Sequence, residues 1–320
     1  MALAAAPGAR DMMFSGTQRP RNLVVVRAGD ASLHPRWLVG ADEAGFDLIV
    51  SYYGDEPARF RSTRENRVDR KGGKWNGVAA LFAERPELLD HYHYVWLPDD
   101  DIETDAHTIG GLFAAMAYYD LALAQPSLTH DSHYTYVAYL SSRTFALRYA
   151  TAIEIMAPCL SAGLLRQVLP LIADSPSGWG LDFVWTRLAA DNRRRSAILD
   201  QWPVRHTRAP RGGSLYAAMV AEGRSAWDDF AAMRRRFGRL KPFPLIYEAL
   251  DARGRAWRDP RAIGLRMTID YLVDRPRIAH YSTAKTNILP LLRRQLGYTA
   301  DLSQLSTSDG FAADAKIATP

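Results

Sequence analysis

Residues 92–102 read Tyr-His-Tyr-Val-Trp-Leu-Pro-Asp-Asp-Asp-Ile. The first six residues form an aromatic and apolar run that is typical of a buried strand, and Pro98 ends it. Asp99, Asp100 and Asp101 follow at once, and three adjacent anions repel each other. A divalent cation that prefers oxygen ligands would offset this repulsion. Asp99 and Asp101 lie on the same side of an extended chain, so the stretch predicts a metal site at the end of a strand. The structural alternative is a solvated acidic loop that caps the following helix.

The segments around this stretch alternate between strand and helix patterns. The expected strands span residues 23–26, 46–52, 92–97 and 121–124, and the expected helices span 75–83 and 105–119. Such alternation predicts an α/β sandwich with a mostly parallel sheet. Ligands bind at the carboxyl ends of parallel strands. The loops that should share this rim are 29–30, 53–55, 99–101 and 125–126.

The second half of the chain has a more helical pattern. A helix is expected over 182–190, and a short strand over 197–199. From residue 215 to about 296 the pattern is helical and is interrupted by prolines, which predicts a C-terminal helical appendage. The expected organisation is a disordered tail over 1–20, an α/β domain over 21–214, a helical region over 215–300 and a loose tail over 301–320.

Composition excludes several classes of protein. Hydrophobic residues make up 48% of the 320 residues and charged residues 23%, which provides enough apolar surface for a folded core. The single cysteine, Cys159, can form neither an internal disulfide nor a cysteine-built zinc site. No apolar run is long enough to cross a membrane. Together with the lack of a secretory signal pattern, these features indicate a cytoplasmic protein.

The net charge of +5 is spread along the chain, which disfavours a nucleic-acid partner because such partners select concentrated charge. Short basic clusters occur at Arg193–Arg195 and Arg234–Arg236. Such clusters are typical of solvated helix ends. The alternatives are an anionic substrate and peripheral association with a membrane surface. Membrane association would place the protein at the inner face of the membrane.

A second motif, Ser177-Gly178-Trp179-Gly180-Leu181-Asp182, combines a tight turn with an aromatic ring and a carboxylate. Its glycines allow the backbone to approach a ligand closely, and Trp179 offers a flat face that could stack on a sugar. Asp182 is a candidate general base for an acceptor hydroxyl, or it caps the helix that it begins. Glu154 is a lone carboxylate in an apolar stretch and needs a partner, which makes it a second candidate base.

Two basic motifs could hold anions. Residues 69–75 join two lysines and a glycine pair to the start of a helix, although they lack the spacing of a P-loop. Residues 204–208 and the following Arg211-Gly212-Gly213 supply arginines that could pair with phosphates. His206, within the second motif, is either a metal ligand or a buried histidine with one hydrogen bond.

In this order, an Asp-x-Asp after a strand, a Trp-Gly-x-Asp turn and a late histidine resemble the GT-A glycosyltransferases. The chain also resembles the uncharacterised family called domain of unknown function 707, found in plants and bacteria. The matching segments are residues 26–32, 46–54, 71–75, 96–102, 154–158, 178–183 and 206–208. The resemblance implies a GT-A-like three-layer α/β sandwich over roughly residues 22–216.

The resemblance also implies roles for individual residues. Asp99, Asp101 and His206 would bind Mn²⁺ or Mg²⁺ on the diphosphate of a nucleotide-sugar, and Asp100 would contact the ribose. Asp182 would be the base, although Leu181 stands where inverting galactosyltransferases have a glutamate. The other residues expected to contact the donor are Gly29, Asp30, Ser32, Lys71, Lys74 and Arg208. The residues expected to contact the acceptor are Trp179, Gly180 and Glu154.

These motifs predict a metal-dependent glycosyltransferase that moves a sugar, with inversion, from a nucleotide-diphosphate donor to a hydroxyl of a glycan or lipid-linked acceptor. A metal-dependent phosphatase or nucleotidyltransferase could use the same carboxylates. Haloacid-dehalogenase-type phosphatases, however, require Thr or Val at the position that Glu103 occupies here. A non-catalytic carbohydrate-binding protein is a further alternative.

Overall fold

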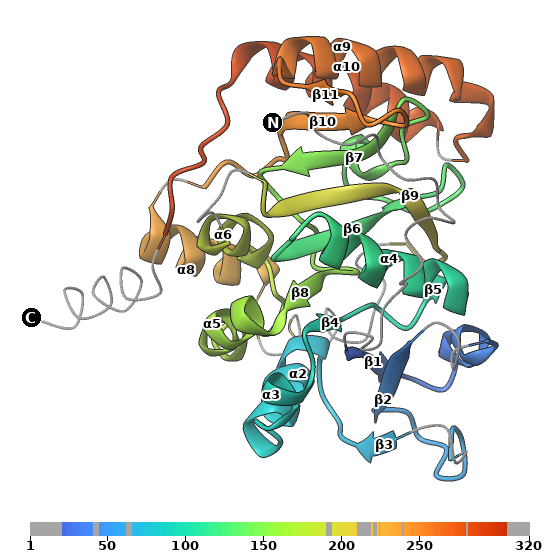
Figure 1. The fold of residues 1–320 in the computed structure, drawn as a ribbon. Coiled ribbons are helices and arrows are strands. Elements are labelled where there is room, and N and C mark those ends of the chain that lie inside the picture. The colour runs from blue at the N-terminus through green and yellow to red at the C-terminus, as the bar shows by residue number, and fades with distance from the viewer. Residues whose placement is uncertain are drawn as a thin grey trace, which may run out of the picture.

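We describe the fold from a computed structural model, which describes residues 21–40, 45–61, 66–189, 194–209, 219, 223, 225–238, 240–279 and 281–305. Within these residues an 11-stranded sheet runs through the molecule in the order β11-β10-β7-β9-β6-β8-β4-β1-β2-β3, and β5 pairs with β9 beside it (Figure 1). The strands are β1 (Asn22–Ala28), β2 (Phe46–Tyr52), β3 (Asn66–Asp69), β4 (Tyr94–Trp96), β5 (Ile102–Glu103), β6 (Leu123–Leu128), β7 (Phe145–Ala150), β8 (Cys159–Ser161), β9 (Ser196–His206), β10 (Ile246–Asp251) and β11 (Ala256–Trp257).

The sheet is mixed, which corrects the expectation of a mostly parallel sheet. β1 is parallel to β2 and β4, and β6 is parallel to β9. β8, however, runs antiparallel between β4 and β6, and β7 runs antiparallel between β9 and β10. The sequence pattern missed both strands. β8 has only three residues, which is too few to show a period, and β7 is buried on both faces and therefore shows no alternation.

The C-terminal part of the chain is not purely helical, which corrects the expectation of a helical appendage. β10 pairs antiparallel with β7, and β11 pairs with β10, so strands from both sides of residue 214 share one sheet. The β10 sequence, Ile-Tyr-Glu-Ala-Leu-Asp, places apolar residues at helical spacing. The whole strand is buried, and pairing with β7 overrides this local preference.

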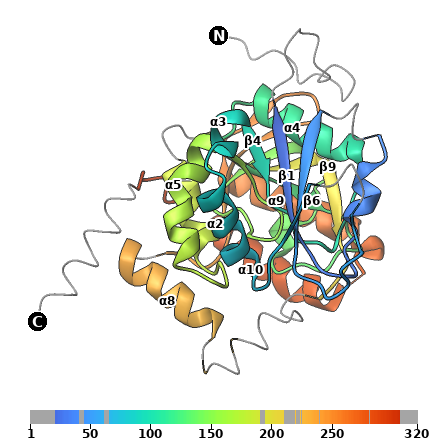
Figure 2. The same ribbon diagram turned by 90° about the horizontal axis from the view of Figure 1, so that it is seen from below.

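Helices cover the sheet. They are α2 (Lys74–Glu84), α3 (Leu88–His91), α4 (Ala106–Tyr118), α5 (Ala162–Ala173), α6 (Leu181–Leu188), α8 (Ala226–Phe237), α9 (Pro260–Val273) and α10 (Tyr281–Gly297), with the 3-10 turns η1 (His34–Leu38), η2 (Val137–Tyr139) and η3 (Arg275–Arg277). α2 and α5 lie side by side over β1, β4 and β8 (Figure 2), and α4 packs against β6 and β9. α9 and α10 form a helical hairpin beside β10 (Figure 1).

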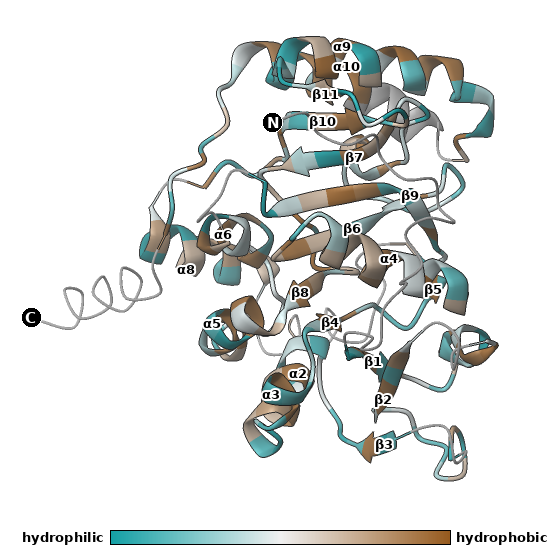
Figure 3. Cartoon of the chain, in the orientation of Figure 1, coloured by the Kyte–Doolittle hydropathy of each residue, from teal (hydrophilic) through white to brown (hydrophobic). Residues whose placement is uncertain are grey.

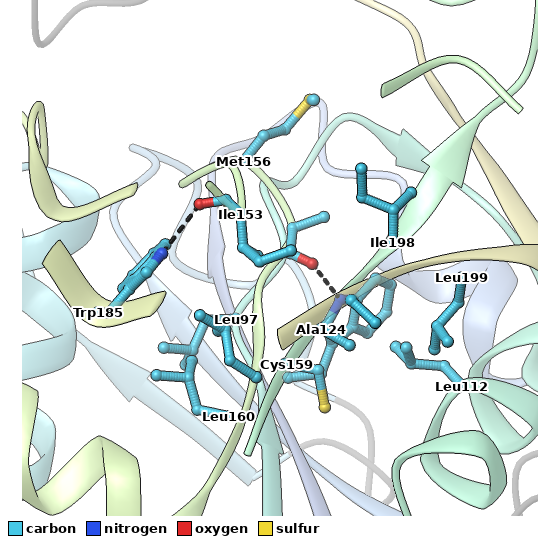
Figure 4. Close-up of a cluster of buried hydrophobic side chains, with 14 of the residues drawn as sticks. Leu97, Leu112, Ala124, Ile153, Met156, Cys159, Leu160, Trp185, Ile198 and Leu199 are labelled. Carbon is cyan, nitrogen blue, oxygen red and sulfur yellow. Dashed lines mark hydrogen bonds between the residues drawn. The ribbon is translucent and has the colours of Figure 1, made fainter. Parts of the chain in front are cut away.

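The centre of the core fixes a loop that carries site residues. Apolar side chains from β6, β8, β9 and α4 pack together there with Ile153 and Met156 (Figure 4). The Trp185 indole nitrogen donates to the Ile153 carbonyl at 2.9 Å, and the Ile153 amide donates to the Asp182 carbonyl at 3.2 Å. The 153–156 loop is therefore tied to the start of α6, which brings Glu154 and Asp182 into the same part of the molecule.

Candidate functional site

The three aspartates lie where four parallel strands end. Beyond β4 the chain stays extended, because the Leu97 and Asp99 amides donate to the Pro158 and Met156 carbonyls, both at 2.8 Å. β5 then pairs antiparallel with the end of β9, with Ile102 opposite His206. This register places Asp101 next to His206, although 105 positions separate them in the chain.

Asp99, Asp101 and His206 form a compact group. Each offers one ligand atom, and these atoms all lie within 4.8 Å of one another. His206 Nε2 lies 3.1 Å from Asp101 Oδ2, and His206 Nδ1 lies 3.0 Å from the His133 carbonyl oxygen. Because a carbonyl only accepts, Nδ1 carries a proton, and Nε2 is the ring nitrogen that faces the carboxylates. Two carboxylates and one imidazole are a donor set that suits Mn²⁺ or Mg²⁺.

The protonation of this group is set by its internal pairing. Burial alone would raise the pKa of Asp101, but the hydrogen bond and charge of His206 lower it below its ordinary value. Burial likewise opposes protonation of His206, yet the neighbouring Asp101 raises its pKa. Asp101 and His206 thus stabilise each other's charged forms, and a metal bound by Nε2 would compete with a proton on that nitrogen.

Lys74 holds the first carboxylate from the side of α2. Its Nζ donates to Asp99 Oδ1 at 2.7 Å and to the carbonyls of Ile155 and Met156 at 2.8 and 2.9 Å. Burial lowers the pKa of Lys74 despite the opposing effect of Asp99. Gly73 begins α2 without a side-chain cap. The helix start and the ammonium group thus supply positive potential beside the metal group.

Asp100 has its own hydrogen-bond partners and is not part of the metal group. Its Oδ2 accepts from the Gly29 amide at 2.7 Å, and its Oδ1 accepts from Arg208 Nη1 at 3.1 Å. Burial raises the pKa of Asp100. Arg208 also donates to the Ala31 carbonyl at 3.1 Å. Asp100 and Arg208 therefore join the loop after β1 to the end of β9, and they stand on one flank of the metal group.

Other residues predicted to contact the donor hold their own loops. Asp30 accepts from the Tyr52 hydroxyl and from the Asp55 amide, and the Tyr52 hydrogen bond lowers the pKa of Asp30. Ser32 Oγ lies 2.7 Å from His34 Nδ1. Lys71 is exposed, and its Nζ donates to the carbonyls of the 53–54 turn and to Asp55 Oδ1 at 2.6 Å. These side chains lie on the expected rim, and a role in binding the donor stays a prediction.

Glu154 and Asp182, proposed separately as bases, are electrostatically coupled, with Glu154 buried and Asp182 half-buried. The Glu154 amide donates to Gln125 Oε1 at 2.5 Å, but Glu154 Oε2 has no hydrogen-bond partner in the described part of the chain. Burial raises the pKa of Glu154 to about 7. Burial also raises the pKa of Asp182 well above its ordinary value, and the charge of Glu154 raises it further. Burial, and then the charges of Glu154 and Asp182, raise the pKa of Tyr139. Its hydroxyl is also buried without a hydrogen-bond partner among the described residues.

The turn before Asp182 has the conformation that its glycines allow. Gly180 is the N-cap of α6 at φ 96°, a left-handed conformation that L side chains rarely adopt. Asp182 lies in the first turn of α6, and its Oδ1 accepts from the Gly180 amide at 3.1 Å. Capping therefore accounts for one carboxylate oxygen, and Asp182 still carries the electrostatic coupling to Glu154 described above.

Trp227 is a further candidate for the site that no sequence motif indicates. Its ring stands edge-on to Trp179 with centroids 5.0 Å apart, and the residue is 59% exposed. α8 is fixed here because Asp229 Oδ2 accepts from the amide and hydroxyl of Ser177 at 2.9 and 2.6 Å. Trp179 and Trp227 lie 48 positions apart, and no local pattern links them. Together they form an aromatic pair beside the turn that leads to Asp182.

No protein-family model matches the sequence, and no curated protein matches it. Among solved structures, the crystal structure of GalNAc-T7 with UDP, GalNAc and Mn²⁺ is similar at a TM-score of 0.48 and 8% identity, over 68% of this chain and 48% of that one. The structure of S. aureus TarS 1–349 in complex with UDP-GlcNAc is similar at a TM-score of 0.38 and 9% identity, over 88% of this chain and 74% of that one. This chain thus spans about half the length of the first. A likeness this distant assigns neither ligand nor activity, and membership of the family that the motifs resemble stays a prediction.

Arg205, another basic candidate, is engaged outside the metal group. Arg205 is paired with Glu103 and Asp131, both at 2.9 Å, so its charge is already neutralised. Arg211-Gly212-Gly213 and Arg193 lie outside the described residues.

Cys159 is buried, and burial raises the pKa of its thiol well above the ordinary value. A buried neutral thiol is a poor nucleophile.

Proposed function

We propose that this protein is a metal-dependent glycosyltransferase that moves a sugar from a nucleotide-diphosphate donor to a hydroxyl acceptor. One observation carries the proposal. A metal-type donor set, Asp99, Asp101 and His206, lies within 4.8 Å on the strand-end rim, next to a second pair of carboxylates, the buried Glu154 and the half-buried Asp182. Transfer from a diphosphate needs both functions, because one group must neutralise the leaving phosphates and another must take the proton of the acceptor.

The donor side would work through charge. Bound Mn²⁺ or Mg²⁺ would neutralise the leaving diphosphate as a Lewis acid. Lys74 and Arg208 flank the metal group and would add positive charge to the same phosphates. Asp100 is occupied by the Gly29 amide and Arg208. Its first role in this proposal is to position the loop containing Gly29, Asp30 and Ser32, where the nucleotide would lie.

The acceptor side would work through proton transfer. The effective pKa of a general base should lie near the working pH, and burial has moved the pKa of both Glu154 and Asp182 in that direction. Two coupled carboxylates titrate as a pair. We assign Asp182 as the base that accepts the hydroxyl proton, with Glu154 holding the acceptor beside it. Trp179 and Trp227 would stack on the acceptor sugar, and direct attack would invert the anomeric carbon.

A thermal-shift screen tests the proposal. The purified chain is melted with UDP, GDP, CDP and their sugars, each with Mn²⁺, Mg²⁺ or EDTA, because a ligand that binds the folded state raises the melting temperature. We expect a metal-dependent rise with one nucleotide diphosphate, lost in Asp101→Ala. The matched control is Asp90→Ala, an exposed acid paired only with Arg166 among described residues, which should keep the rise.

Product analysis separates the transferase from its competitors. A transferase releases the nucleoside diphosphate from its sugar donor, whereas a phosphatase releases phosphate and a nucleotidyltransferase releases pyrophosphate. A folded sample that shows no shift with any nucleotide in the presence of metal would overturn the proposal.

A further inference from the structure

The outer face of the α9–α10 hairpin is far more apolar than a solvated surface requires. The two helices run antiparallel and pack closely: Gln295 Nε2 donates to the Pro260 carbonyl at 3.0 Å, and a Cβ built on Gly264 would lie 2.5 Å from Gln295 Cβ. Six large apolar side chains on this hairpin are 42 to 70% exposed. They are Leu265, Ile269, Leu272 and Val273 of α9, and Leu289 and Leu296 of α10.

These side chains share one surface. Positions 265, 269 and 272 follow the three- and four-residue spacing of one helix face, and positions 289 and 296 are two turns apart on the other helix. Gly264 of α9 and Gln295 of α10 meet at the contact between the helices. On each helix, the apolar face is rotated about the helix axis from this contact residue, and the sense of rotation is the same for both helices. In antiparallel helices this places both faces on the same side of the pair. Figure 3 shows the brown bands of α9 and α10 at the outside of the molecule.

The charges on this surface have one sign. Between residues 260 and 298 the sequence contains seven basic and two acidic residues. Both acids, Asp270 and Asp274, are buried, and Asp270 is paired with Arg266 at 3.0 Å. Arg261 and Arg293 are exposed and have no carboxylate partner within the described residues. Arg293 lies four residues after Leu289 and three before Leu296, so an unpaired guanidinium stands within the apolar face.

We propose that this face docks on the surface of a lipid bilayer that contains anionic lipids. Exposed leucines with arginines among them are the composition of interfacial helices, whose apolar side chains enter the headgroup region while guanidinium groups bind lipid phosphates. No described helix combines the length and apolar character needed to cross a bilayer. A second copy of the chain fits less well, because a symmetric contact would bring the unpaired arginines of both copies together. This inference is independent of the proposed function.

Vesicle flotation of the full chain tests the proposal. The probes are phosphatidylcholine vesicles with and without phosphatidylserine, at low and high salt. We expect binding only to the anionic vesicles, weakened by salt because surface electrostatics are screened. The double variants Leu265→Ser/Leu272→Ser and Arg261→Glu/Arg293→Glu should each lower the bound fraction more than about tenfold. Because all four side chains are exposed, both variants should melt at the wild-type temperature.

Two matched controls locate the surface. Val39→Ser removes an exposed valine elsewhere, and Arg234→Glu/Arg235→Glu reverses two charges in the basic cluster of α8; neither should change flotation. Loss of flotation in the α8 variant alone, or wild-type flotation in both hairpin variants, would overturn the proposal. So would an absence of flotation in the wild type, or a dimer in light scattering that the leucine variant dissolves.

Discussion

The candidate site has two halves, the metal group with its flanking residues and the acid pair of Glu154 and Asp182. The two halves differ in how their carboxylates are stabilised. The metal group contains its own cations: His206 pairs with Asp101, Lys74 with Asp99, and Arg208 with Asp100. In the acid pair, the hydrogen bond from Thr135 and the charges of His206 and Lys74 act on Glu154 but do not outweigh the effect of burial. Glu154 keeps one oxygen without a described partner, and burial raises the pKa of both Glu154 and Asp182.

This difference indicates which half is suited to binding a metal and which to transferring a proton. The hydrogen bond and charge of His206 hold the pKa of Asp101 below its ordinary value, so an incoming metal meets a ligand carboxylate that favours its ionised form. Burial raises the pKa of Glu154 to about 7, so this carboxyl can hold and exchange a proton near neutral pH, and burial raises the pKa of Asp182 as well. The first half is suited to binding charge and the second to moving protons, although both stand on the same rim.

The largest expected effect is on the proton-transfer half. Asp182→Asn keeps an oxygen for the Gly180 amide but cannot take a proton. We expect kcat to fall by about 10²- to 10⁴-fold, while the metal-dependent melting shift with the donor stays as in the wild type. Steady-state transfer rates and the thermal-shift assay together make the measurement. A variant that loses donor binding as well would show that the two halves are not separate.

Breaking the metal half should remove the donor binding that Asp182→Asn keeps. Asp101→Asn removes one ligand and the partner of His206, so the metal-dependent shift with the nucleotide should disappear. Transfer should fall by about 10²- to 10³-fold, since charge stabilisation at the leaving group is lost. Isothermal titration with Mn²⁺ checks the loss directly, and Asp90→Ala serves again as the control. Retained Mn²⁺ affinity in Asp101→Asn would place the metal elsewhere.

Stability should depend on pH through Glu154. The folded protein holds the pKa of this carboxyl at about 7, against an ordinary value of 4.5. Between these values the unfolded chain releases a proton that the folded chain keeps, so this contribution to stability is lost as pH rises. Glu154→Gln cannot ionise. Relative to wild type, its free energy of unfolding should therefore gain about 3 kcal/mol between about pH 4 and about pH 8.

Urea unfolding at the two pH values measures this change. Glu87→Gln, an exposed glutamate beside Arg85, should differ from wild type by the same amount at both. The free energy of unfolding of Glu154→Gln is compared with that of wild type at both pH values. If this difference also stays constant with pH, the carboxyl of Glu154 titrates normally, and the proposed contrast between the acid pair and the metal group is wrong for Glu154.

The smallest expected effect concerns the aromatic pair. Trp227→Ala removes a half-exposed ring that contacts Trp179, and stacking on a sugar is worth about as much as other aromatic contacts. We expect the KM for the acceptor to rise about tenfold, with the KM for the donor unchanged. Trp227→Phe should recover most of the loss. An equal change in both KM values would indicate that Trp227 supports α8 rather than the acceptor.

Much of the parallel half of the fold could be predicted, because its signals are local. Residues 46–52 were expected as a strand and form β2, and the helix expected after Asp105 is α4, with Asp105 as its N-cap. β7, β8 and β10 could not be predicted. Burial on both faces, short length or helical spacing hides their period, and pairing with distant strands decides their structure.

The site shows the same division. Alternation along an extended chain places Asp99 and Asp101 on one side, and the register of β5 on β9 then adds His206. The sequence could not show that Asp100 would be taken up by the Gly29 amide, or that Lys71 would bind its own neighbouring turn. It also could not place Trp227 beside Trp179. Such contacts depend on how α8 and the loops pack, which no short pattern records.

The pairing of β10 with β7 bears on how the gene could be shortened. A chain that stops at residue 214 would retain β7 and lose the partner that satisfies its outer amides and carbonyls. An interior strand would become an unprotected border, which is a template for strand addition by another molecule. The residues after 214 thus cover the edge of the sheet that β7 would otherwise expose. A fragment made without them should aggregate even though the metal group and both candidate bases, Glu154 and Asp182, are still present.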